Sequence, residues 1–222
     1  MKQNFNKKVW IQAAIDVEDI DLAKKIAFMA LDAGAEWLEV GTPLLYTYGH
    51  TVIGSLRKAV GSNAILVADY KCPFAVLCAP QAARQGADYV MLTAGYTDSW
   101  VKGSLDCAKA VGITPILDVE IRPEDISWRI AQYRAMGAEH IFSHHYSRYA
   151  DPQGSAQPID NMPALRSVEG ITLGITSDNL EEARSAVRLG ADWITFGWVL
   201  RDPKPEVCRH WINTIRAARE GV

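Results

Sequence analysis

The sequence predicts one eight-stranded parallel barrel surrounded by helices, a (β/α)8 TIM barrel. A phrase of Gly-Ala-acid-aromatic or Gly-Ala-acid-His occurs four times at intervals of about 52 residues, beginning at Gly34, Gly86, Gly137 and Gly190. Four further apolar runs lie between these phrases, at residues 9–15, 64–68, 113–119 and 170–175. Eight apolar runs that alternate with amphipathic stretches predict parallel strands joined by crossover helices, and eight such strands close without a free edge.

Each repeated phrase predicts the end of a helix and the start of a strand. A glycine at a helix C-cap takes up the left-handed backbone that other residues avoid, and the residues after it begin an apolar run. The chain is therefore expected to repeat in quarters, each with a strand, a helix that ends at the phrase glycine, and a second strand. The second strands are expected to begin at Trp37, Tyr89, His140 and Trp193.

The length of 222 residues predicts a single domain over residues 1–222. The structural alternative is an open, doubly wound sheet. No Gly-x-Gly-x-x-Gly follows the first apolar run, which disfavours that alternative.

Composition is typical of a soluble domain with a large core. Hydrophobic residues make up 49% of the chain, and 23 basic against 26 acidic residues give a net charge of −3. The sequence has no cluster of positive charge, which is the feature that would indicate nucleic acid or an anionic membrane as a partner. Residues 1–8 are too short and polar for a secretory signal, and no run approaches the ~20 apolar residues of a membrane span, so we expect a cytoplasmic protein.

The four cysteines show no CxxC spacing and are expected to be small buried hydrophobes. Cys72 has one competing interpretation, because Lys71 beside it would lower the pKa of a thiol on the same face. Adjacent residues of a strand point to opposite faces, which argues against this.

Nearly every predicted strand ends in a polar or ionisable residue. Catalytic groups of this fold lie at the carboxyl ends of the strands, and a purely structural barrel would not need such a rim. In strand order these residues are Asp16, Glu39 with Thr42, Asp69 with Lys71, Thr93, Asp118 with Glu120, His144 with His145, Thr176 with Ser177, and Gly197.

Glu39, Asp69 and Lys71 carry the most specific chemistry. Glu39 and Asp69 end neighbouring strands, so both carboxylates can meet at one Mg2+, which uses one or two protein carboxylates and leaves sites for water and substrate. Lys71 lies two residues beyond Asp69 and is expected on the same face, where its ammonium can stabilise an enolate oxygen or deliver a proton. A structural ion-pair network with Asp16 is the alternative, although such networks are costly to bury.

These residues carry a family resemblance. The segments Ala14-Ile15-Asp16, Glu39-Val40-Gly41-Thr42-Pro43-Leu44 and Ala68-Asp69-Tyr70-Lys71, with Glu120 and His144, resemble the orotidine 5′-monophosphate decarboxylase suprafamily. Within it they most resemble the branch of 3-keto-L-gulonate 6-phosphate decarboxylase and hexulose-6-phosphate synthase. The resemblance runs from about Trp10 to Arg216.

The resemblance implies a role for each matching residue. Glu39 and Asp69 would bind Mg2+, which holds a cis-enediolate, and Lys71 would assist. Asp16 would contact substrate hydroxyls, while Glu120 and His144 would return a proton. An enediolate serves both decarboxylation of a 3-keto acid and aldol chemistry, because each delocalises a carbanion onto oxygen.

The chain departs from the family motif Asp-x-Lys-x-x-Asp. The last acid, which in relatives reaches across a dimer interface, is Phe74 here. The resemblance implies a homodimer with Phe74 near the interface, where an apolar ring cannot orient Lys71.

The phosphate site departs as well. Relatives use glycine-rich backbone after strand seven and Gly-Arg after strand eight, whereas this chain has Thr176, Ser177, Asp178 and Asn179 after strand seven and Gly197-Trp198 after strand eight. Two alternatives stay open: the substrate lacks a terminal phosphate, or Thr176, Ser177 and Asn179 form a replacement site. The position of Trp198 after a strand end and beside a glycine favours ligand contact.

The segment after strand six combines His144 and His145 with aromatic residues. His145 stands where the decarboxylases carry Arg or another polar residue, and adjacent histidines face opposite ways, so a shared metal site is not expected. Residues 151–157 are a candidate lid or an ordinary surface loop. Trp100 follows another strand end and is a further candidate for lining the pocket.

Three hypotheses follow. The first is Mg2+-dependent decarboxylation of a 3-keto sugar acid, phosphorylated or not, which Glu120 favours because the hexulose-6-phosphate synthases lack the matching acid. The second is an aldolase or isomerase of the hexulose-6-phosphate synthase type at the same site. The third is a non-catalytic sugar-binding or scaffold barrel, in which Phe74 and Trp198 record lost activity.

Overall fold

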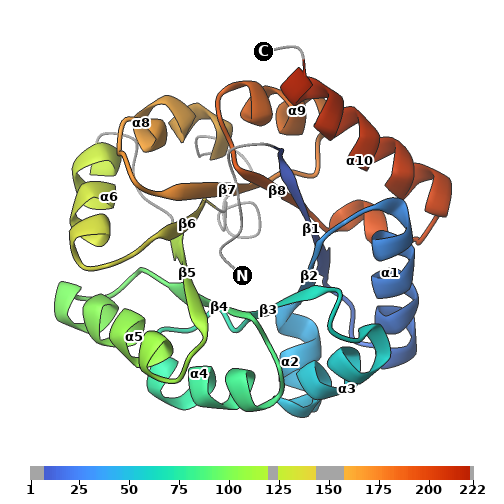
Figure 1. Cartoon of the computed structure of the whole chain (residues 1–222), viewed down its shortest axis with the longest axis horizontal. Helices are drawn as coiled ribbons and strands as arrows, with labels where there is room; N and C mark the ends of the chain where they lie inside the picture. The colour runs from blue at the N-terminus through green and yellow to red at the C-terminus, as the bar shows by residue number, and fades with distance from the viewer. Residues whose placement is uncertain (1–7, 120–124, 144–157, 221–222) are drawn as a thin grey trace.

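Eight parallel strands close into a barrel. The computed structural model describes residues 8–119, 125–143 and 158–220. The strands pair in chain order from β1 to β8, and β8 pairs with β1 to complete the ring, as the view down the barrel in Figure 1 shows. The (β/α)8 prediction is confirmed. An open doubly wound sheet is excluded, because it would leave two unpaired edge strands.

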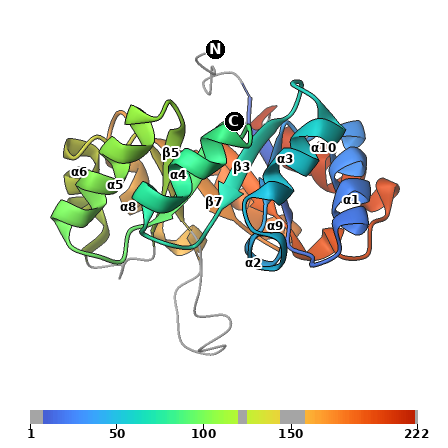
Figure 2. The same ribbon diagram turned by 90° about the horizontal axis from the view of Figure 1, so that it is seen from below.

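The strands are β1 (Trp10–Ile15), β2 (Trp37–Val40), β3 (Ile65–Asp69), β4 (Tyr89–Thr93), β5 (Thr114–Val119), β6 (His140–Ser143), β7 (Thr172–Thr176) and β8 (Trp193–Phe196). The α-helices are α1 (Ile20–Ala33), α2 (Thr42–Tyr48), α3 (Thr51–Val60), α4 (Ala75–Arg84), α5 (Asp98–Ala110), α6 (Ile126–Ala135), α8 (Met162–Arg166), α9 (Leu180–Arg188) and α10 (Pro205–Glu220). Two short 3-10 helices are η2 (Pro158–Asn161) and η3 (Trp198–Leu200). Seen from the side, the helices form a band around the sheet, with α2 at one rim (Figure 2).

The four repeated glycines end helices as predicted. Their φ angles are +105° at Gly34, +88° at Gly86, +102° at Gly137 and +100° at Gly190. Each donates its N–H to a carbonyl three residues earlier, at 3.0 Å in all four cases. A side chain with a Cβ is strained in this left-handed region, so glycine is required where the chain turns from helix to strand.

A basic side chain from another helix binds each repeated phrase; we call these contacts the basic clamps. In each clamp the cation donates to the carbonyl of the phrase glycine and pairs with the acid of the same phrase. The four cations are Arg216, Arg57, Lys109 and Arg166, and their acids are Glu36, Asp88, Glu139 and Asp192. The repeat therefore serves the amino-terminal end of the barrel, away from the polar rim.

Aromatic side chains fill the barrel interior toward the amino-terminal ends of the strands. Trp37 stacks on Tyr89 with ring centroids 4.7 Å apart and lies 5.4 Å from Trp193, which is parallel to Phe142. The predicted packing role of Trp37 and Trp193 is confirmed, since both are fully buried. A Cβ at Gly174 would overlap the Trp193 ring, so only glycine leaves room for it. This buried aromatic cluster lies beneath the polar cavity, toward the amino-terminal end of the barrel.

All four cysteines are free thiols. Cys78 and Cys208 are buried as expected, but Cys72 and Cys107 are partly exposed, so the prediction of buried cysteines is only half right. Within the described ranges, none of the helices combines the length and the apolar character needed to span a bilayer.

Candidate active site at the mouth of the barrel

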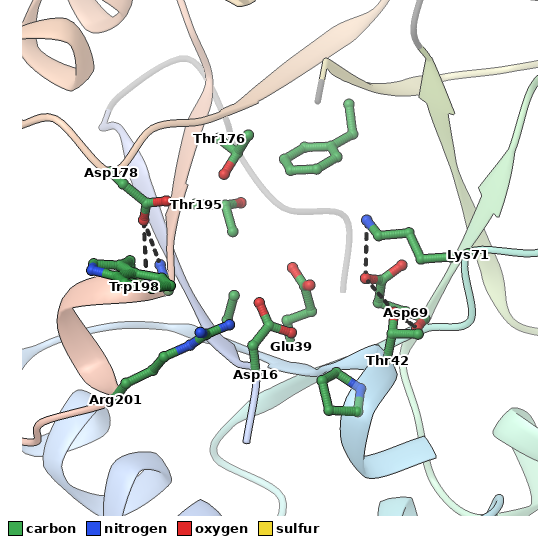
Figure 3. Close-up of a pocket in the computed structure, with 14 residues that line it drawn as sticks. Asp16, Glu39, Thr42, Asp69, Lys71, Thr176, Asp178, Thr195, Trp198 and Arg201 are labelled. Carbon is green, nitrogen blue, oxygen red and sulfur yellow. Dashed lines mark hydrogen bonds and ion pairs between the residues drawn. The ribbon is translucent and has the colours of Figure 1, made fainter. Parts of the chain in front are cut away.

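A cavity of about 270 Å³ opens at the carboxyl ends of the strands. Its charged lining comes from several elements, and Figure 3 shows these side chains converging on one space. They are Asp16, Glu39, Asp69, Lys71, Asp178 and Arg201. A cavity of this size and polarity suits a small hydroxylated ligand.

Three carboxyl groups share this cavity. Asp16 follows β1, Glu39 lies in β2, and Asp69 ends β3, so each comes from a neighbouring strand. Glu39 and Asp69 are buried, at 4% and 1% exposure. Burial, followed by the charges of Asp69 and Asp16, raises the pKa of Glu39 well above its ordinary value. Burial and the charge of Asp69 also raise the pKa of Asp16, to about 6. The site therefore favours the arrival of a cation or a proton.

A glycine allows the closest approach within this group. A Cβ at Gly41 would collide with Oδ1 of Asp16 and would lie 2.6 Å from the Ile15 carbonyl oxygen. Gly41 precedes Thr42 and Pro43, and a proline in the first turn suits the start of α2. The Gly-Thr-Pro segment thus begins a helix while leaving space for the Asp16 carboxylate.

Lys71 lies among the acids. Its Nζ is 3.0 Å from Oδ2 of Asp69 and 3.2 Å from Oδ2 of Asp118, a buried residue of β5. Thr42 Oγ1 donates to the carbonyl oxygen of Asp69 at 3.0 Å and lies 3.3 Å from its Oδ2. The φ of Lys71 is +49°, the one left-handed non-glycine backbone in the described ranges. Such conformations carry a cost and cluster at functional sites.

The acids suit a divalent ion held by few protein ligands. Oδ1 of Asp69 is buried and has no hydrogen-bond partner among the described residues. Glu39 has one oxygen bound by the Gln12 amide, which leaves the other available. In the parts of the chain that the structure describes, no three His, Cys, Asp or Glu side chains form a complete metal-binding group. Two carboxylates, with water and substrate completing the shell, are the arrangement that Mg2+ uses, so Glu39 and Asp69 fit this ion.

The opposite wall is formed by the ends of β7 and β8. Thr176, Gly197 and Trp198 line the cavity, as predicted from the strand ends. Oδ1 of Asp178 accepts the N–H groups of Trp198 at 3.0 Å and Gly197 at 3.4 Å. A carboxylate of the chain itself therefore occupies the backbone donors at this wall.

Arg201 is a site residue that the sequence analysis missed. Its guanidinium lies 4.4 Å from the centroid of the Trp198 ring, within cation–π distance, and it lines the cavity. The 3-10 turn of η3 places residues three apart on the same side of the chain. The spacing of Trp198 and Arg201 after the last strand was therefore the sequence signal that could have identified Arg201.

Other predicted site residues lie elsewhere. Ser177 does not line the cavity: its hydroxyl donates to the carbonyl of Asn179 and contacts Glu182, because it folds back onto the start of α9. Trp100 is also outside the cavity; it packs edge-to-face on Phe74, and its indole donates to the Pro73 carbonyl. Glu120, His144, His145 and the loop at 151–157 lie outside the described residues.

The fold and the mouth together define a (β/α)8 barrel with an acidic, lysine-bearing site at the carboxyl ends of its strands. No family model matches the chain. The sequence is 32% identical over 135 residues to 3-hexulose-6-phosphate synthase of Mycobacterium gastri, which covers 60% of this chain and 64% of that protein. It is 29% identical over 199 residues to a bifunctional enzyme Fae/Hps of Methanospirillum hungatei, covering 85% of this chain and 47% of that one. The chain thus spans less than two thirds of the length of either of these relatives.

Solved structures share the fold over nearly the whole chain. 3-Hexulose-6-phosphate synthase from Salmonella typhimurium superposes with a TM-score of 0.83 at 19% identity, over 95% of this chain and 100% of that one. KGPDC from Streptococcus mutans gives 0.77 at 18% identity, over 95% and 98%. The chain is thus similar in sequence to hexulose-6-phosphate synthases over much of its length, and it shares the fold of that enzyme and of KGPDC.

Proposed function

We propose that this protein is a Mg2+-dependent carbon–carbon lyase that catalyses an aldol reaction on a sugar phosphate of the hexulose-6-phosphate class. The observation that carries the proposal is the meeting of Glu39 and Asp69 in one cavity with the Lys71 ammonium 3.0 Å from Asp69. The names of the curated relatives reported above support the aldol reaction.

In this proposal Glu39 and Asp69 hold Mg2+. When bound, the ion supplies Lewis acidity to substrate oxygens that gain negative charge. Lys71 extends its positive charge into the same cavity and is oriented from two sides, by Asp69 and by Asp118. A positioned ammonium stabilises negative charge on a neighbouring oxygen and can donate a proton to it.

Asp16 is assigned to the substrate hydroxyls. Its raised pKa, about 6, lets the carboxyl group be either a donor or an acceptor near neutral pH. Gly41 holds the backbone of the next strand close to it, which limits the positions that the carboxyl group can take. The group is therefore suited to fixing the orientation of a hydroxylated chain.

Decarboxylation of a 3-keto sugar acid is the second candidate. Glu120 placed this reaction first on sequence grounds, but the curated relatives favour the aldol hypothesis instead. The fold similarity to KGPDC is the reason to test decarboxylation as well. Glu120 and His144, which this reaction would use to return a proton, lie outside the described residues.

Arg201 is assigned to the anionic end of the substrate. The resemblance places an arginine directly after the glycine of strand eight, and here Trp198 stands at that position with Arg201 against its ring. Arg201 and Thr176 both line the cavity. A guanidinium and a hydroxyl there would bind a phosphate, while Asp178 would weaken its binding by repulsion.

A second copy of the chain is the partner that we propose for an exposed apolar surface at the start of α4 and α5. The surface consists of Phe74, Val76, Leu77, Tyr96 and Trp100, each at least 41% exposed. Apolar clusters of this kind mark interaction sites. Light scattering should give a dimer that Leu77→Glu converts to a monomer; an unchanged mass in that variant would refute this interface.

The proposed reaction is tested with a small substrate panel in the presence of Mg2+. The panel contains ketohexose 6-phosphates, their unphosphorylated forms, and 3-keto sugar acids, and both released aldehyde and trapped CO2 are measured. Aldehyde release that disappears with chelator and in Glu39→Gln supports the aldol lyase, whereas CO2 release selects the decarboxylase. Failure to bind any divalent ion, together with inactivity on the whole panel, would leave the scaffold hypothesis.

A further inference from the structure

Two thiols meet beside the candidate active site. The Sγ atoms of Cys72 and Cys78 lie 3.9 Å apart, and neither residue is in a disulfide. Cys72 is in the turn between β3 and α4, directly after Lys71, and Cys78 is in α4. A disulfide has an S–S distance of about 2.05 Å, so the sulfurs must approach by about 2 Å, a movement that combines side-chain rotation with a shift of the turn that carries Cys72.

The two thiols differ in exposure. Cys72 is partly exposed, whereas Cys78 is 3% exposed. A small oxidant therefore reaches Cys72 first, and Cys78 lies behind it as the group that completes a bridge. Cys107 and Cys208 form no such pair; Cys208 is buried in the main core.

The electrostatics support the same order of events. The hydrogen-bonding contact between the two thiols lowers the pKa of Cys72 to about 7, so a substantial fraction is thiolate at neutral pH. The same contact and burial raise the pKa of Cys78. The exposed partner is the nucleophile, and the buried partner stays protonated until Cys72 has reacted.

We propose that Cys72 and Cys78 form an oxidation site, at which a peroxide or a small disulfide produces an intramolecular disulfide that displaces Lys71. With hydrogen peroxide, the Cys72 thiolate attacks one oxygen and breaks the O–O bond, giving a sulfenic acid and water once a proton is taken up. The Cys78 sulfur then attacks the Cys72 sulfur and a second water leaves. Two thiols lose two electrons and two protons, and the peroxide is reduced to two waters.

The surroundings of Cys72 direct the movement toward Lys71. In the residue after Cys72, the Pro73 carbonyl accepts hydrogen bonds from Ser104 Oγ at 2.8 Å and Trp100 Nε1 at 2.9 Å. That side of the turn is held against α5. The residue before Cys72 is Lys71, whose left-handed backbone at φ +49° is already unfavourable. When Cys72 moves toward α4, the Lys71 backbone is the part of the turn that yields.

The bridge is tested directly by mass spectrometry of the folded full chain. After brief treatment of the folded chain with hydrogen peroxide, followed by denaturation without reductant, we expect a loss of about 2 Da and protection of two of the four cysteines from maleimide, both reversed by dithiothreitol. Peptide mapping should place the bridge between residues 72 and 78. Cys72→Ser and Cys78→Ser should both abolish the loss, with Cys78→Ser giving a glutathione adduct on Cys72 when oxidised glutathione is the oxidant. Cys107→Ser is the matched control and should behave as the wild type.

Retention of four reactive thiols in the oxidant-treated wild type, or a bridge that persists in Cys72→Ser, would overturn the site. The effect on Lys71 rests on the proposed function and is measured separately. Oxidation should lower turnover at least tenfold in the wild type and leave Cys78→Ser active under the same treatment, or Cys78→Ala if the serine variant folds poorly. A bridge without loss of turnover would overturn the displacement of Lys71. Absence of all activity before oxidation would count against the proposed function, while the mass still decides the bridge.

Discussion

Lys71 and Asp118 form an ion pair of 3.2 Å that joins the turn after β3 to β5 across the mouth of the barrel. The family motif provides a last acid near the lysine from a partner subunit, and this chain has Phe74 at that position. Phe74 is 46% exposed and packs on Trp100 instead of entering the cavity. Asp118 thus provides Lys71 with a second acidic contact from within its own chain.

Lys71→Ala is expected to lower turnover by ~10²-fold or more, because it removes a positioned charge and acid–base group. Asp118→Asn should lower turnover by a smaller factor of about ten, since the lysine keeps its charge but loses the orienting contact with the Asp118 carboxylate. Steady-state kinetics on the active substrate checks both. Asp106→Asn, which removes only a surface pair with Lys102, is the control. Near-normal turnover of Lys71→Ala would refute its role.

Glu39→Gln and Asp69→Asn are each expected to weaken Mg2+ binding at least tenfold while the fold is retained. The amide keeps the shape of the side chain and removes the charge that the ion requires. In metal-free protein, Glu39→Gln should not lower the melting temperature, because the wild type buries a carboxyl group next to two other acids. Isothermal titration with Mg2+ and thermal unfolding measure the two effects. Unaltered Mg2+ affinity in both variants would place the ion elsewhere.

Mg2+ affinity should fall as the pH is lowered through about 6. Asp16 has its pKa raised to about 6 and Glu39 is raised as well, so at pH 5 the ion must displace protons from the site. In metal-free protein the contribution of Asp16 to stability changes with pH in the opposite direction, because it is larger at low pH. The folded state holds the Asp16 proton more tightly than the unfolded state, so its contribution to stability is lost as the pH rises from about 4 to 6. Titrations at pH 5 and 7.5 in two buffers should show more proton release at the lower pH, and a pH-independent affinity would contradict the prediction.

Asp178 and Arg201 should have opposite effects on the affinity of the site for anions. Arg201→Gln is expected to weaken inhibition by inorganic phosphate and to raise KM for a phosphorylated substrate about tenfold or more, because a charged hydrogen bond is lost. Asp178→Asn should strengthen phosphate inhibition, since the amide still accepts the Trp198 N–H but no longer repels the anion. Arg209→Gln, whose side chain pairs with Asp32 on the outer helices, serves as the control. Equal effects of Arg201→Gln and Arg209→Gln would remove Arg201 from the site.

Arg57→Met is expected to destabilise the fold without changing the chemistry. Arg57 donates to the carbonyls of Gly61, Ala64 and Gly86 and pairs with Asp88, and all these groups lie at the amino-terminal end of the barrel. Methionine keeps the apolar stem, so the loss measures the hydrogen bonds, about 2–4 kcal/mol in the free energy of unfolding. Urea unfolding gives the value, and kcat of the folded variant should match the wild type. Little destabilisation would mean that the basic clamps contribute little to stability.

The sequence by itself determined the architecture of the chain and one side of its site. The repeated glycines and the eight apolar runs predicted the barrel, because helix ends and strand faces follow from local backbone preferences and a period of two. The same period placed Glu39 and Asp69 at the mouth of the barrel, and the structure brings them to one cavity. Lys71 joins them there as its place in the sequence predicted, although through a left-handed backbone beyond the end of β3 and not through the strand period. These relationships are local, or extend only to the neighbouring strand, so the order of residues is enough to anticipate them.

Tertiary structure decided the contacts between distant segments. Asp118 meets Lys71 from two strands away, Asp178 turns back to bind the amides at Gly197 and Trp198, and Arg201 returns through a 3-10 turn to the cavity. Ser177 folds onto α9 instead of the cavity that its place at a strand end suggested. Strand spacing tells which residues reach the rim, but the direction of each side chain there depends on competing hydrogen bonds and charges from other loops. Those competitors become neighbours only when the barrel closes.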